Sequence, residues 1–493
     1  MRYLYTGADA KIIDDHATRI VGMPSLVLME RAAMTAAKVM MERENKDTRF
    51  LAVCGTGNNG GDGVATARIL HEMGYKSAIT IVGYPDSMSP ETRKQTEIAV
   101  SSHVPVIPMS AVRDSEFDVI IDGLFGVGLS RDITDVYEQM IDDINESGAF
   151  IYSLDIPSGI NAGTGEVMGT AVRAGTTVTF GVNKLGLILH PGCEYAGEVI
   201  VADIGFPGDS IKANQSPYYH YEPEDIAERL PKRHARSHKG DFGHVLVAAG
   251  SETMCGAAVL AANAAFRIGA GMVKVLSSPL NRDIIFNSVP EALFATTDEL
   301  PEALDWADAI VIGPGLGLSD EALELVRYVI DNSPVPTVID GDGIRLCRNI
   351  TMKLSDNFIL TPHRKEMSYL TGHTMEELKK SPVSTAFDAA MDTKSIVVAK
   401  DFRTIVSDGN TCYINVSGNN GMSTAGSGDV LAGMIGGLLG QGMEPFDAAR
   451  LAVYIHGLSG DVMAEKVSNY SLMASDLIDG IGEVIREATQ NAI

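Results

Sequence analysis

Residues 419–440 read NNGMSTAGSGDVLAGMIGGLLG, and this stretch decides the fold of the C-terminal half of the chain. Residues 425–428 (AGSG) predict a turn that binds an anion at the start of a helix, because helix N-termini present unpaired N–H donors and a positive dipole end. Asp429 stands beside that turn, where a carboxylate can take the proton of an attacking hydroxyl group. Each glycine in the following helix costs about 1 kcal/mol relative to alanine, which indicates a packing or ligand constraint on its backbone.

Short apolar runs rich in valine and isoleucine alternate with longer helical patterns along nearly the whole chain. This alternation predicts repeated β-α units and parallel sheets. The expected strands are residues 50–54, 78–82, 119–122, 151–154, 245–248, 309–312, 337–339 and 396–399. In an open parallel sheet, ligands bind outside the carboxyl ends of the strands, so the residues directly after these runs are candidates for chemistry.

The alternation is interrupted once, between Phe206 and Asp241, by a segment rich in proline, glycine and charge. This segment contains one helix candidate, at residues 224–230, and it predicts a domain boundary near residues 215–225. No sequence period of about 20–50 residues is visible, so we expect two different α/β domains and not a repeat array.

The composition excludes several classes of protein. The 39 basic and 64 acidic residues give a net charge of −25, which disfavours a nucleic-acid partner. The five cysteines stand far apart with no CxxC pair, so they predict neither a disulfide framework nor a zinc site and fit a reducing compartment. No signal peptide is visible, and the longest apolar stretch, residues 430–440, is too short to span a membrane. We therefore expect a cytoplasmic protein with no membrane partner.

A second glycine loop, GTGNNGGDGVATARIL at residues 55–70, follows the expected strand 50–54. Gly55, Gly57 and Gly60 have the spacing GxGxxG of a phosphate-binding turn, although this match alone is weak. A dinucleotide fingerprint also needs an acidic residue at the end of the next strand, and here that strand runs into Val82 and Gly83, which disfavours an ordinary dehydrogenase. The run NNGGDG instead adds two amides and a carboxylate to the turn, although a plain capped turn has the same composition.

Polar residues follow two further strands of this half. Asp122 ends one strand, and Asp155 and Ser158 follow another. With Asn59, the oxygens of Asp122 and Ser158 suit a hard cation, whereas Asp155 can move a proton. Each residue alone is explained by a turn or a cap. Three strand ends in one sheet that carry oxygen-bearing side chains favour a ligand-binding site.

The second half carries further candidates. GPGLG at residues 313–317 is another loop that allows close backbone approach. Pro362 is expected to start a helix with His363 in its first turn, where the helix dipole keeps the imidazole neutral, although a lone histidine is usually structural. Lys400 follows the expected strand 396–399 and is therefore a candidate site residue. The alternative interpretation is an ordinary surface lysine.

Four motifs of the first half resemble the N-terminal epimerase domain of NAD(P)H-hydrate repair enzymes: MPSLVLMERAA (23–33), NNGGDG (58–63), DGLFGVGL (122–129) and SLDIPSG (153–159). The resemblance implies a Rossmann-like, three-layer α/β/α domain over residues 1–220, with Asp155 as the catalytic residue at the hydrated nicotinamide. It implies a potassium ion held by Asn59, Asp122 and Ser158. The substrate-binding residues that it implies, in addition to Asp155, are Asn58, Asn59, Gly60, Gly61, Asp62, Gly126, Val127, Gly128, Leu129, Ser130, Arg131 and Asp132.

Five motifs of the second half resemble the nucleotide-dependent NAD(P)H-hydrate dehydratases within the ribokinase-like fold: SHKGDFG (237–243), GAAVLAANAAFRIGAGMV (256–273), GPGLG (313–317), LTPHRKEMSYLTG (360–372) and GNNGMSTAGSGDVLAG (418–433). The resemblance implies a ribokinase-like α/β domain over residues 221–493. Two positions depart from the family pattern: Asp401 replaces a common glycine, and Ser427 a frequent threonine. The resemblance implies hydrate-binding residues Ala257, Gly317, His363 and Asp429, and nucleotide-binding residues Lys400, Asp401, Phe402, Arg403, Thr404 and Gly428.

Together the two resemblances predict a bifunctional metabolite-repair enzyme. One domain would interconvert the two epimers of NADH or NADPH hydrate, and the other would dehydrate one of them with ADP, or ATP, as phosphoryl donor and magnesium on its phosphates. Asp429 is the expected base of that second reaction. Two alternatives stay open: a ribokinase-like kinase for a small molecule with an accessory N-terminal domain, or a non-catalytic N-terminal binding module. We also expect a homo-oligomer.

Overall fold

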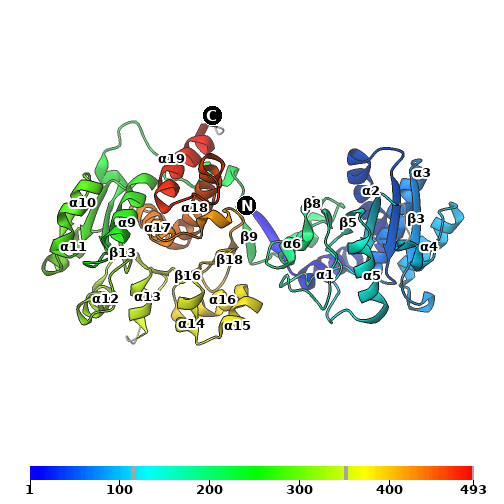
Figure 1. Ribbon diagram of the computed structural model, residues 1–493, viewed down its shortest axis with the longest axis horizontal. Helices are drawn as coiled ribbons and strands as arrows, with labels where there is room; N and C mark the ends of the chain where they lie inside the picture. Colours follow the sequence, from blue (N-terminus) through cyan, green and yellow to red (C-terminus); the bar gives the residue numbers. More distant parts are fainter. Residues whose placement is uncertain (114–116, 349–353, 491–493) are drawn as a thin grey trace. The chain divides into compact units, whose positions relative to one another are not determined.

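The computed structural model describes residues 1–113, 117–348 and 354–490 of the chain, which forms two compact units (Figure 1). The N-terminal unit is Tyr3–Tyr218, and the C-terminal unit is Tyr219–Ile493 together with Met1–Arg2. The chain enters the second unit through β9 (Tyr218–His220).

A parallel sheet of strand order β3-β2-β4-β5-β6-β8 forms the centre of the N-terminal unit. A short parallel pair, β1 with β7, joins Leu4 to Asn183 and Tyr5 to Lys184. The strands are β1 (Arg2–Tyr5), β2 (Arg49–Cys54), β3 (Lys76–Ile81), β4 (Val119–Gly123), β5 (Phe150–Leu154), β6 (Thr176–Phe180), β7 (Asn183–Lys184) and β8 (Glu198–Ala202). The helices are α1 (Gly7–Asp15), α2 (Ser25–Arg43), α3 (Asn58–Glu72), α4 (Pro90–Ser101), α5 (Asp135–Glu146), α6 (Gly192–Ala196) and α7 (Gly208–Lys212).

Alternate residues of the central strands face opposite helical layers, because side chains of a strand point alternately to the two faces of a sheet. On β2, Phe50 and Ala52 pack with α2 and α3 in one core cluster. Leu51 and Val53 pack with Met140, Ile141 and Ile144 of α5 in another. The N-terminal unit is therefore a three-layer α/β/α sandwich, as predicted.

The C-terminal unit has the strand order β12-β11-β10-β13-β14-β15-β16-β17-β18. Pairings from β12 to β16 are parallel, and β16-β17-β18 continue as an antiparallel edge. The strands are β10 (His244–Ala248), β11 (Met272–Leu276), β12 (Leu293–Ala295), β13 (Ala309–Ile312), β14 (Thr337–Ile339), β15 (Phe358–Leu360), β16 (Ile396–Ala399), β17 (Ile405–Ser407) and β18 (Cys412–Ile414). The helices are α8 (Glu224–Arg229), α9 (Cys255–Ile268), α10 (Arg282–Ser288), α11 (Leu300–Trp306), α12 (Asp320–Asn332), α13 (Asp342–Cys347), α14 (Arg364–Thr371), α15 (Met375–Lys380), α16 (Pro382–Thr393), α17 (Ser427–Gly440), α18 (Pro445–Val467) and α19 (Ala474–Gln490).

The glycines of α17 are explained by packing. A Cβ atom on Gly433 would lie 2.1 Å from the carbonyl oxygen of Ala261 on α9, and one on Gly436 would lie 2.3 Å from the Val311 side chain on β13. Helix α17 therefore lies directly against its neighbours. At these two positions, packing and not a ligand explains why the residue is glycine. Residues 246, 248, 310 and 312 face the opposite helical layer, α11 to α13.

The strands expected from the sequence are all present, with ends that differ by at most two residues. The helix candidate at 224–230 is α8. The five cysteines are free, and four of them are buried. In the part of the chain that the structure describes, no helix combines the length and the apolarity that crossing a membrane requires.

Candidate active sites

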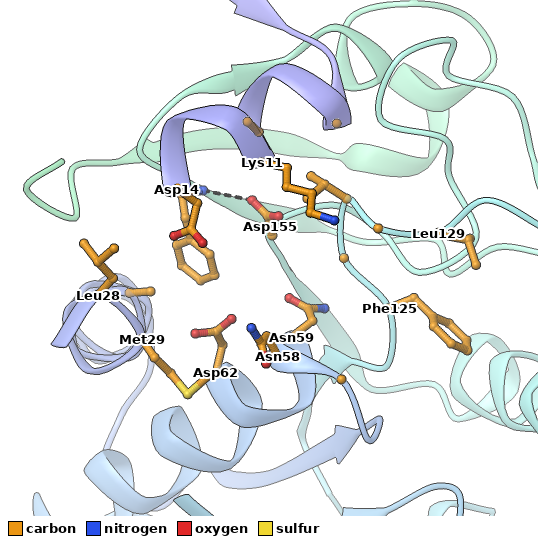
Figure 2. A pocket seen from close by; sticks show the side chains of 18 of the residues that line it. Lys11, Asp14, Leu28, Met29, Asn58, Asn59, Asp62, Phe125, Leu129 and Asp155 are labelled. Atoms are coloured by element: carbon orange, nitrogen blue, oxygen red, sulfur yellow. Dashed lines mark hydrogen bonds between the residues drawn. The ribbon is translucent and has the colours of Figure 1, made fainter. Parts of the chain in front are cut away.

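A cavity of about 850 Å³ opens at the carboxyl ends of β2, β4 and β5 in the N-terminal unit (Figure 2). It is where the predicted N-terminal residues collect. Those that line it are Asn58, Asn59, Asp62, Gly126, Val127, Gly128, Leu129, Ser130, Arg131 and Asp155. Gly60, Gly61 and Asp132 do not line it.

Only one glycine of the GxGxxG spacing faces open space. A Cβ on Gly60 would lie 1.8 Å from the Gly55 carbonyl oxygen, and one on Gly55 would lie 2.1 Å from that of Leu124, so close backbone packing dictates both. Gly61 instead packs against side chains, those of Met29 and Thr92. Gly57, the N-cap of α3, has nothing within 4 Å of its Cβ position and lines the cavity. The positive end of α3 therefore faces the cavity, where it favours an anion.

Asp155, directly after β5, is held in the cavity by a buried lysine. The Lys184 ammonium, 2% exposed, forms an ion pair with Asp155 Oδ1 and donates to the Phe180 carbonyl at 2.9 Å. Asp155 Oδ1 also accepts from the Phe180 amide at 3.3 Å. Asp155 has φ +64°, in the left-handed region that non-glycine residues rarely adopt. Such strain persists where the surroundings impose it, and it clusters at functional sites.

Four residues of helices also line this cavity with carboxyl groups: Asp14, Asp15, Asp62 and Glu91. Asp62 comes from the second turn of α3, and Asp14 from the end of α1. Burial raises the pKa of Asp62 well above its usual value, and the nearby carboxyl groups of Asp155 and Asp14 raise it further. Burial also raises the pKa of Asp14, with Asp15 and Asp155 adding to the effect.

Sequence reasoning missed five charged residues that line the cavity: Lys11, Asp14, Asp15, Glu91 and Lys184. Lys11 and Asp14 lie in the N-terminal segment KIIDD, which follows no strand of the main sheet. Lys184 is the last residue of β7, which lies outside the main sheet and pairs with β1. The motif GVNKLG at residues 181–186 was the available signal, because a lysine within an apolar segment needs a partner when it is buried.

Asp122 and Ser158 are hydrogen-bonded to each other, and Asn59 lines the cavity. Asp122 is fully buried and accepts from the Ser158 hydroxyl at 2.5 Å, the Ser158 amide at 2.9 Å and the Ser153 hydroxyl at 2.8 Å. Both polar atoms of the Asn59 side chain are buried without a hydrogen-bond partner in the described part of the chain. A buried amide is normally hydrogen-bonded, so the Asn59 oxygen, which has no such partner, fits a role as the ligand of a cation.

The C-terminal unit has its own cavity, of about 660 Å³, at the carboxyl ends of its parallel strands. Of the predicted hydrate-binding residues, Ala257, His363 and Asp429 line it. Gly317 does not line it, but its amide donates to Asp342 Oδ2 at 2.9 Å, and Asp342 does line it. Asp429 lies in the first turn of α17, after the N-cap Gly426, which has φ +90°.

The carboxyl group of Asp429 has a raised pKa. Burial raises its pKa to about 7, and the nearby Asp340 carboxylate contributes to the shift, whereas Lys400 opposes it. A general base works best when its pKa lies near the working pH.

Lys400 lies beside the N-terminus of α17. Its ammonium donates to Asp340 Oδ1 at 2.6 Å, and a Cβ on Gly428 would lie 3.1 Å from that ammonium. Burial alone would lower the pKa of Lys400, but the carboxylates of Asp340 and Glu366 raise it above the usual value. Lys400 and Gly428 therefore lie side by side, and the lysine stays charged.

His363 caps α14 instead of lying in its first turn. Its Nδ1 accepts from the amides of Lys365 and Glu366 at 3.1 and 3.2 Å, and the Glu366 carboxylate accepts from the His363 amide at 2.9 Å. The helix consequently begins at Arg364 and not at Pro362. Burial and the Lys400 charge lower the pKa of His363. The imidazole is therefore neutral, as the sequence predicted, but because of burial and Lys400 and not because of the helix dipole.

The unusual Asp401 is neutralised by a neighbour that sequence reasoning did not connect with it. Its carboxylate forms an ion pair with Arg364 and accepts from the Phe402 amide at 2.7 Å. None of the predicted nucleotide-binding residues 400–404 lines either large cavity. Lys400, Asp401 and Arg403 border a separate hollow of about 30 Å³, and Phe402 and Thr404 do not. The sequence also did not single out Glu366, whose pKa burial raises to about 7.

Fold and sites together define a class: a two-domain α/β enzyme with a Rossmann-like N-terminal unit and a ribokinase-like C-terminal unit. The C-terminal fold matches a ribokinase-like superfamily protein of Enterococcus faecalis with a TM-score of 0.52 and 27% identity, over 56% of this chain and 97% of that one. It also matches the ADP/ATP-dependent NAD(P)H-hydrate dehydratase of Bacillus subtilis, co-crystallised with ATP and Mg²⁺, with a TM-score of 0.51 and 31% identity, over 55% and 98% of the two chains.

Sequence comparison specifies the family. Residues 25–186 match the family described as YjeF-related protein N-terminus, and residues 245–482 match the NAD(P)H-hydrate dehydratase family. The bifunctional NAD(P)H-hydrate repair enzyme Nnr of Thermofilum pendens is 35% identical, over 97% of this chain and 95% of its own, and that of Escherichia coli is 31% identical, over 95% and 91%. The chain belongs to the family of bifunctional NAD(P)H-hydrate repair enzymes.

Proposed function

We propose that this protein repairs hydrated nicotinamide cofactors by two reactions in two separate sites. Residues 1–220 interconvert the R and S epimers of NADH and NADPH hydrate, and residues 221–493 dehydrate the S epimer back to NADH or NADPH with ADP or ATP. The observation that carries this proposal is that each unit has its own cavity at strand carboxyl ends, with a helix N-terminus beside a half-buried carboxyl group.

In the epimerase cavity, the N-terminus of α3 and the loop at residues 126–131 bind the substrate phosphates, because their amides and Arg131 provide hydrogen-bond donors and positive charge. This anchoring brings the hydrated ring against Asp155. Epimerisation needs only that the hydroxyl group leave the hydrated carbon and return to its other face. The Asp155 carboxylate, fixed by Lys184, accepts the proton of the returning water.

In the dehydratase cavity, Asp429 takes the proton of the substrate hydroxyl as its oxygen attacks the terminal phosphoryl group of the nucleotide. The amides of the α17 N-terminus and Lys400 stabilise the negative charge that is transferred. Phosphate then leaves as the ring regains its double bond. Phosphate is a far better leaving group than hydroxide, which is the chemical reason for coupling dehydration to a nucleotide.

Two metal ions belong to this proposal. A potassium ion bound by Asn59, Asp122 and Ser158 fits the orphaned Asn59 amide and the oxygen-only donor set, and it adds positive charge beside the substrate phosphates. Magnesium on the nucleotide phosphates offsets their charge, in keeping with the ATP and Mg²⁺ of the Bacillus subtilis relative.

The test is direct assay of the purified chain with separated R and S hydrates. We expect interconversion without nucleotide, and S-hydrate dehydration only with ADP or ATP and Mg²⁺. Mass spectrometry of the products distinguishes the kinase alternative, because a kinase accumulates a stable phosphorylated product and a dehydratase releases inorganic phosphate. Failure of both reactions would refute the proposal.

Homo-oligomeric assembly and a cytoplasmic location also belong to this proposal. Light scattering coupled to size-exclusion chromatography measures the first, and cell fractionation measures the second.

A further inference from the structure

The epimerase cavity contains more carboxyl groups than buried cations. Asp14, Asp62 and Asp155 all point into it from three different elements, α1, α3 and the end of β5 (Figure 2). Lys184 is 2% exposed and pairs with Asp155 alone. Lys184 stabilises one half-buried carboxylate, and in the described residues no ion pair reaches the half-buried carboxyl groups of Asp14 and Asp62, so a proton on these two groups is favoured.

Asp62 is the carboxyl group without a partner. In the portion of the chain that the structure describes, no hydrogen bond or ion pair reaches its side chain, and its backbone carbonyl accepts from the Thr66 hydroxyl at 2.7 Å. In Figure 2 its carboxyl group lies across the empty space from Asp155. A half-buried carboxylate with no donor and with other carboxyl groups nearby is unfavourable, whereas a protonated carboxyl group can give its hydrogen to a ligand in that space.

The proposed reaction requires such a proton. Water adds to the reduced nicotinamide ring so that the hydroxyl group stands on the carbon next to the ring nitrogen. Loss of that group breaks the C–O bond, and the nitrogen lone pair forms a C=N bond in its place. Hydroxide leaves such a carbon poorly, but water leaves readily, so an acid beside the oxygen lowers the barrier.

We propose that Asp62 is the general acid of epimerisation and works with Asp155 across the ring. Asp62 gives its proton to the leaving oxygen, which departs as water and leaves a ring cation and an Asp62 carboxylate. Water then adds to the opposite face, and Asp155 takes its proton, with the electron pair of the C=N bond returning to nitrogen. Proton exchange between the two carboxyl groups through water restores the starting state. This inference rests on the proposed function and assigns an acid role to a residue expected only to bind substrate.

The surroundings of Asp62 set its pH dependence. Since burial and the neighbouring carboxylates raise its pKa, the acid form dominates at low pH and is lost as pH rises through that raised pKa. The interconversion rate should therefore fall on the alkaline side. The titratable or charged groups around the cavity are Lys11, Asp14 and Asp15 on α1, Cys54 on β2, Glu91 on α4, Arg131 in the loop after β4, Asp155 after β5, and Lys184 on β7.

The test compares Asp62→Asn and Asp62→Glu with the exposed control Asp142→Asn in the full chain. Asp62→Asn keeps the size of the side chain but has no acidic proton, so kcat for interconversion should fall by about 10²–10⁴-fold while KM changes little. Its residual rate should lack the alkaline decline of the wild type. Asp62→Glu should retain that decline with a shifted midpoint, and Asp142→Asn should match the wild type.

Thermal unfolding of the N-terminal unit in the same samples reports on its folding, and dehydration of the S epimer, which uses the other cavity, reports on the amount of active C-terminal unit. The inference is overturned if Asp62→Asn keeps kcat within about threefold of wild type, changes only KM, or keeps the alkaline decline. If Asp62→Asn does not fold, Asp62→Glu decides, and an unchanged midpoint in that variant overturns the inference. If the wild-type chain shows no interconversion above the uncatalysed rate, the proposed epimerase function itself is refuted. If the wild type and Asp62→Asn are both active, only the acid role of Asp62 is refuted.

Discussion

Lys184 donates from its buried ammonium to Asp155 and to the Phe180 carbonyl, so one side chain fixes the carboxylate and the end of the neighbouring strand β6 together. The pairing of β7 with β1 brings this lysine to the cavity, through the register Tyr5 to Lys184. The residue that holds the Asp155 carboxylate is therefore positioned by a strand pair outside the main sheet.

Replacing this lysine should damage the epimerase site more than the rest of the protein. In Lys184→Met the Asp155 carboxylate loses its buried partner, and breaking a buried ion pair costs about 3–5 kcal/mol. We expect loss of interconversion and faster hydrogen exchange in β5 to β7, measured by mass spectrometry, with S-hydrate dehydration retained. The control is Lys38→Met on α2, because Lys38 is 71% exposed and its surface pair with Glu42 contributes about 0–1 kcal/mol. Equal exchange in the two variants would contradict this prediction.

The two reactions should separate by mutation. Asp155→Asn keeps the shape of the side chain and can still accept from Lys184, but it is a far weaker base. We expect it to abolish interconversion of the hydrates while ADP-dependent dehydration of the S epimer continues. The assay is chiral chromatography of the hydrates with and without ADP. Loss of both reactions in a folded variant would argue against two independent sites.

Dehydration should depend on pH through Asp429. Its pKa is raised to about 7, so the carboxylate that accepts a proton is present above that pH and is lost as pH falls through it. The value of kcat/KM should therefore drop about tenfold per pH unit well below 7. Asp429→Asn should bind hydrate and nucleotide yet lose dehydration, whereas the exposed control Asp331→Asn should keep both. If the fall of kcat/KM at low pH persists unchanged in Asp429→Asn, the base is another residue.

The alternation of apolar runs and helices predicted both sheets, because buried parallel strands are short, continuous and apolar. The sequence also identified Asp155 and Asp429, since each directly follows a strand or begins a helix. It did not reveal Lys184, Asp14 or Glu366, which reach the cavities from elements that only the tertiary fold brings there. Their roles depend on burial and on partners far away in the chain.

Glycine spacing was the least reliable guide. Gly55 and Gly60 fit a phosphate-binding pattern, yet both are required by backbone atoms within 2.1 Å of where a Cβ would stand. The same spacing therefore arises from close packing, and the sequence alone cannot separate the two causes.

The ion pair with Arg364 should offset the negative charge of Asp401 at the proposed nucleotide site. In Arg364→Met the Asp401 carboxylate is left unpaired near the expected phosphates, so KM for ADP should rise by about 3–10-fold, which is about 0.7–1.4 kcal/mol. Asp401→Gly should not raise it, and the double variant should recover most of the loss. This double-mutant cycle is measured by steady-state dehydration at saturating hydrate. Additive effects of the two changes would contradict the pairing role.

Potassium should stabilise the N-terminal unit through Asn59. The Asn59 side chain is buried without a partner in the chain as described, and a cation that takes its oxygen removes this cost. An ion that binds only the folded state adds about 2.7 kcal/mol of stability at 100 times its Kd, so Tm should be higher in KCl than in NaCl of equal ionic strength. Asn59→Ala should abolish the difference between the two salts, whereas Asn45→Ala, at an exposed turn, should keep it. The readout is thermal unfolding without substrate, so it does not depend on catalysis. Equal melting in both salts would show that the oxygens of Asn59, Asp122 and Ser158 do not select potassium.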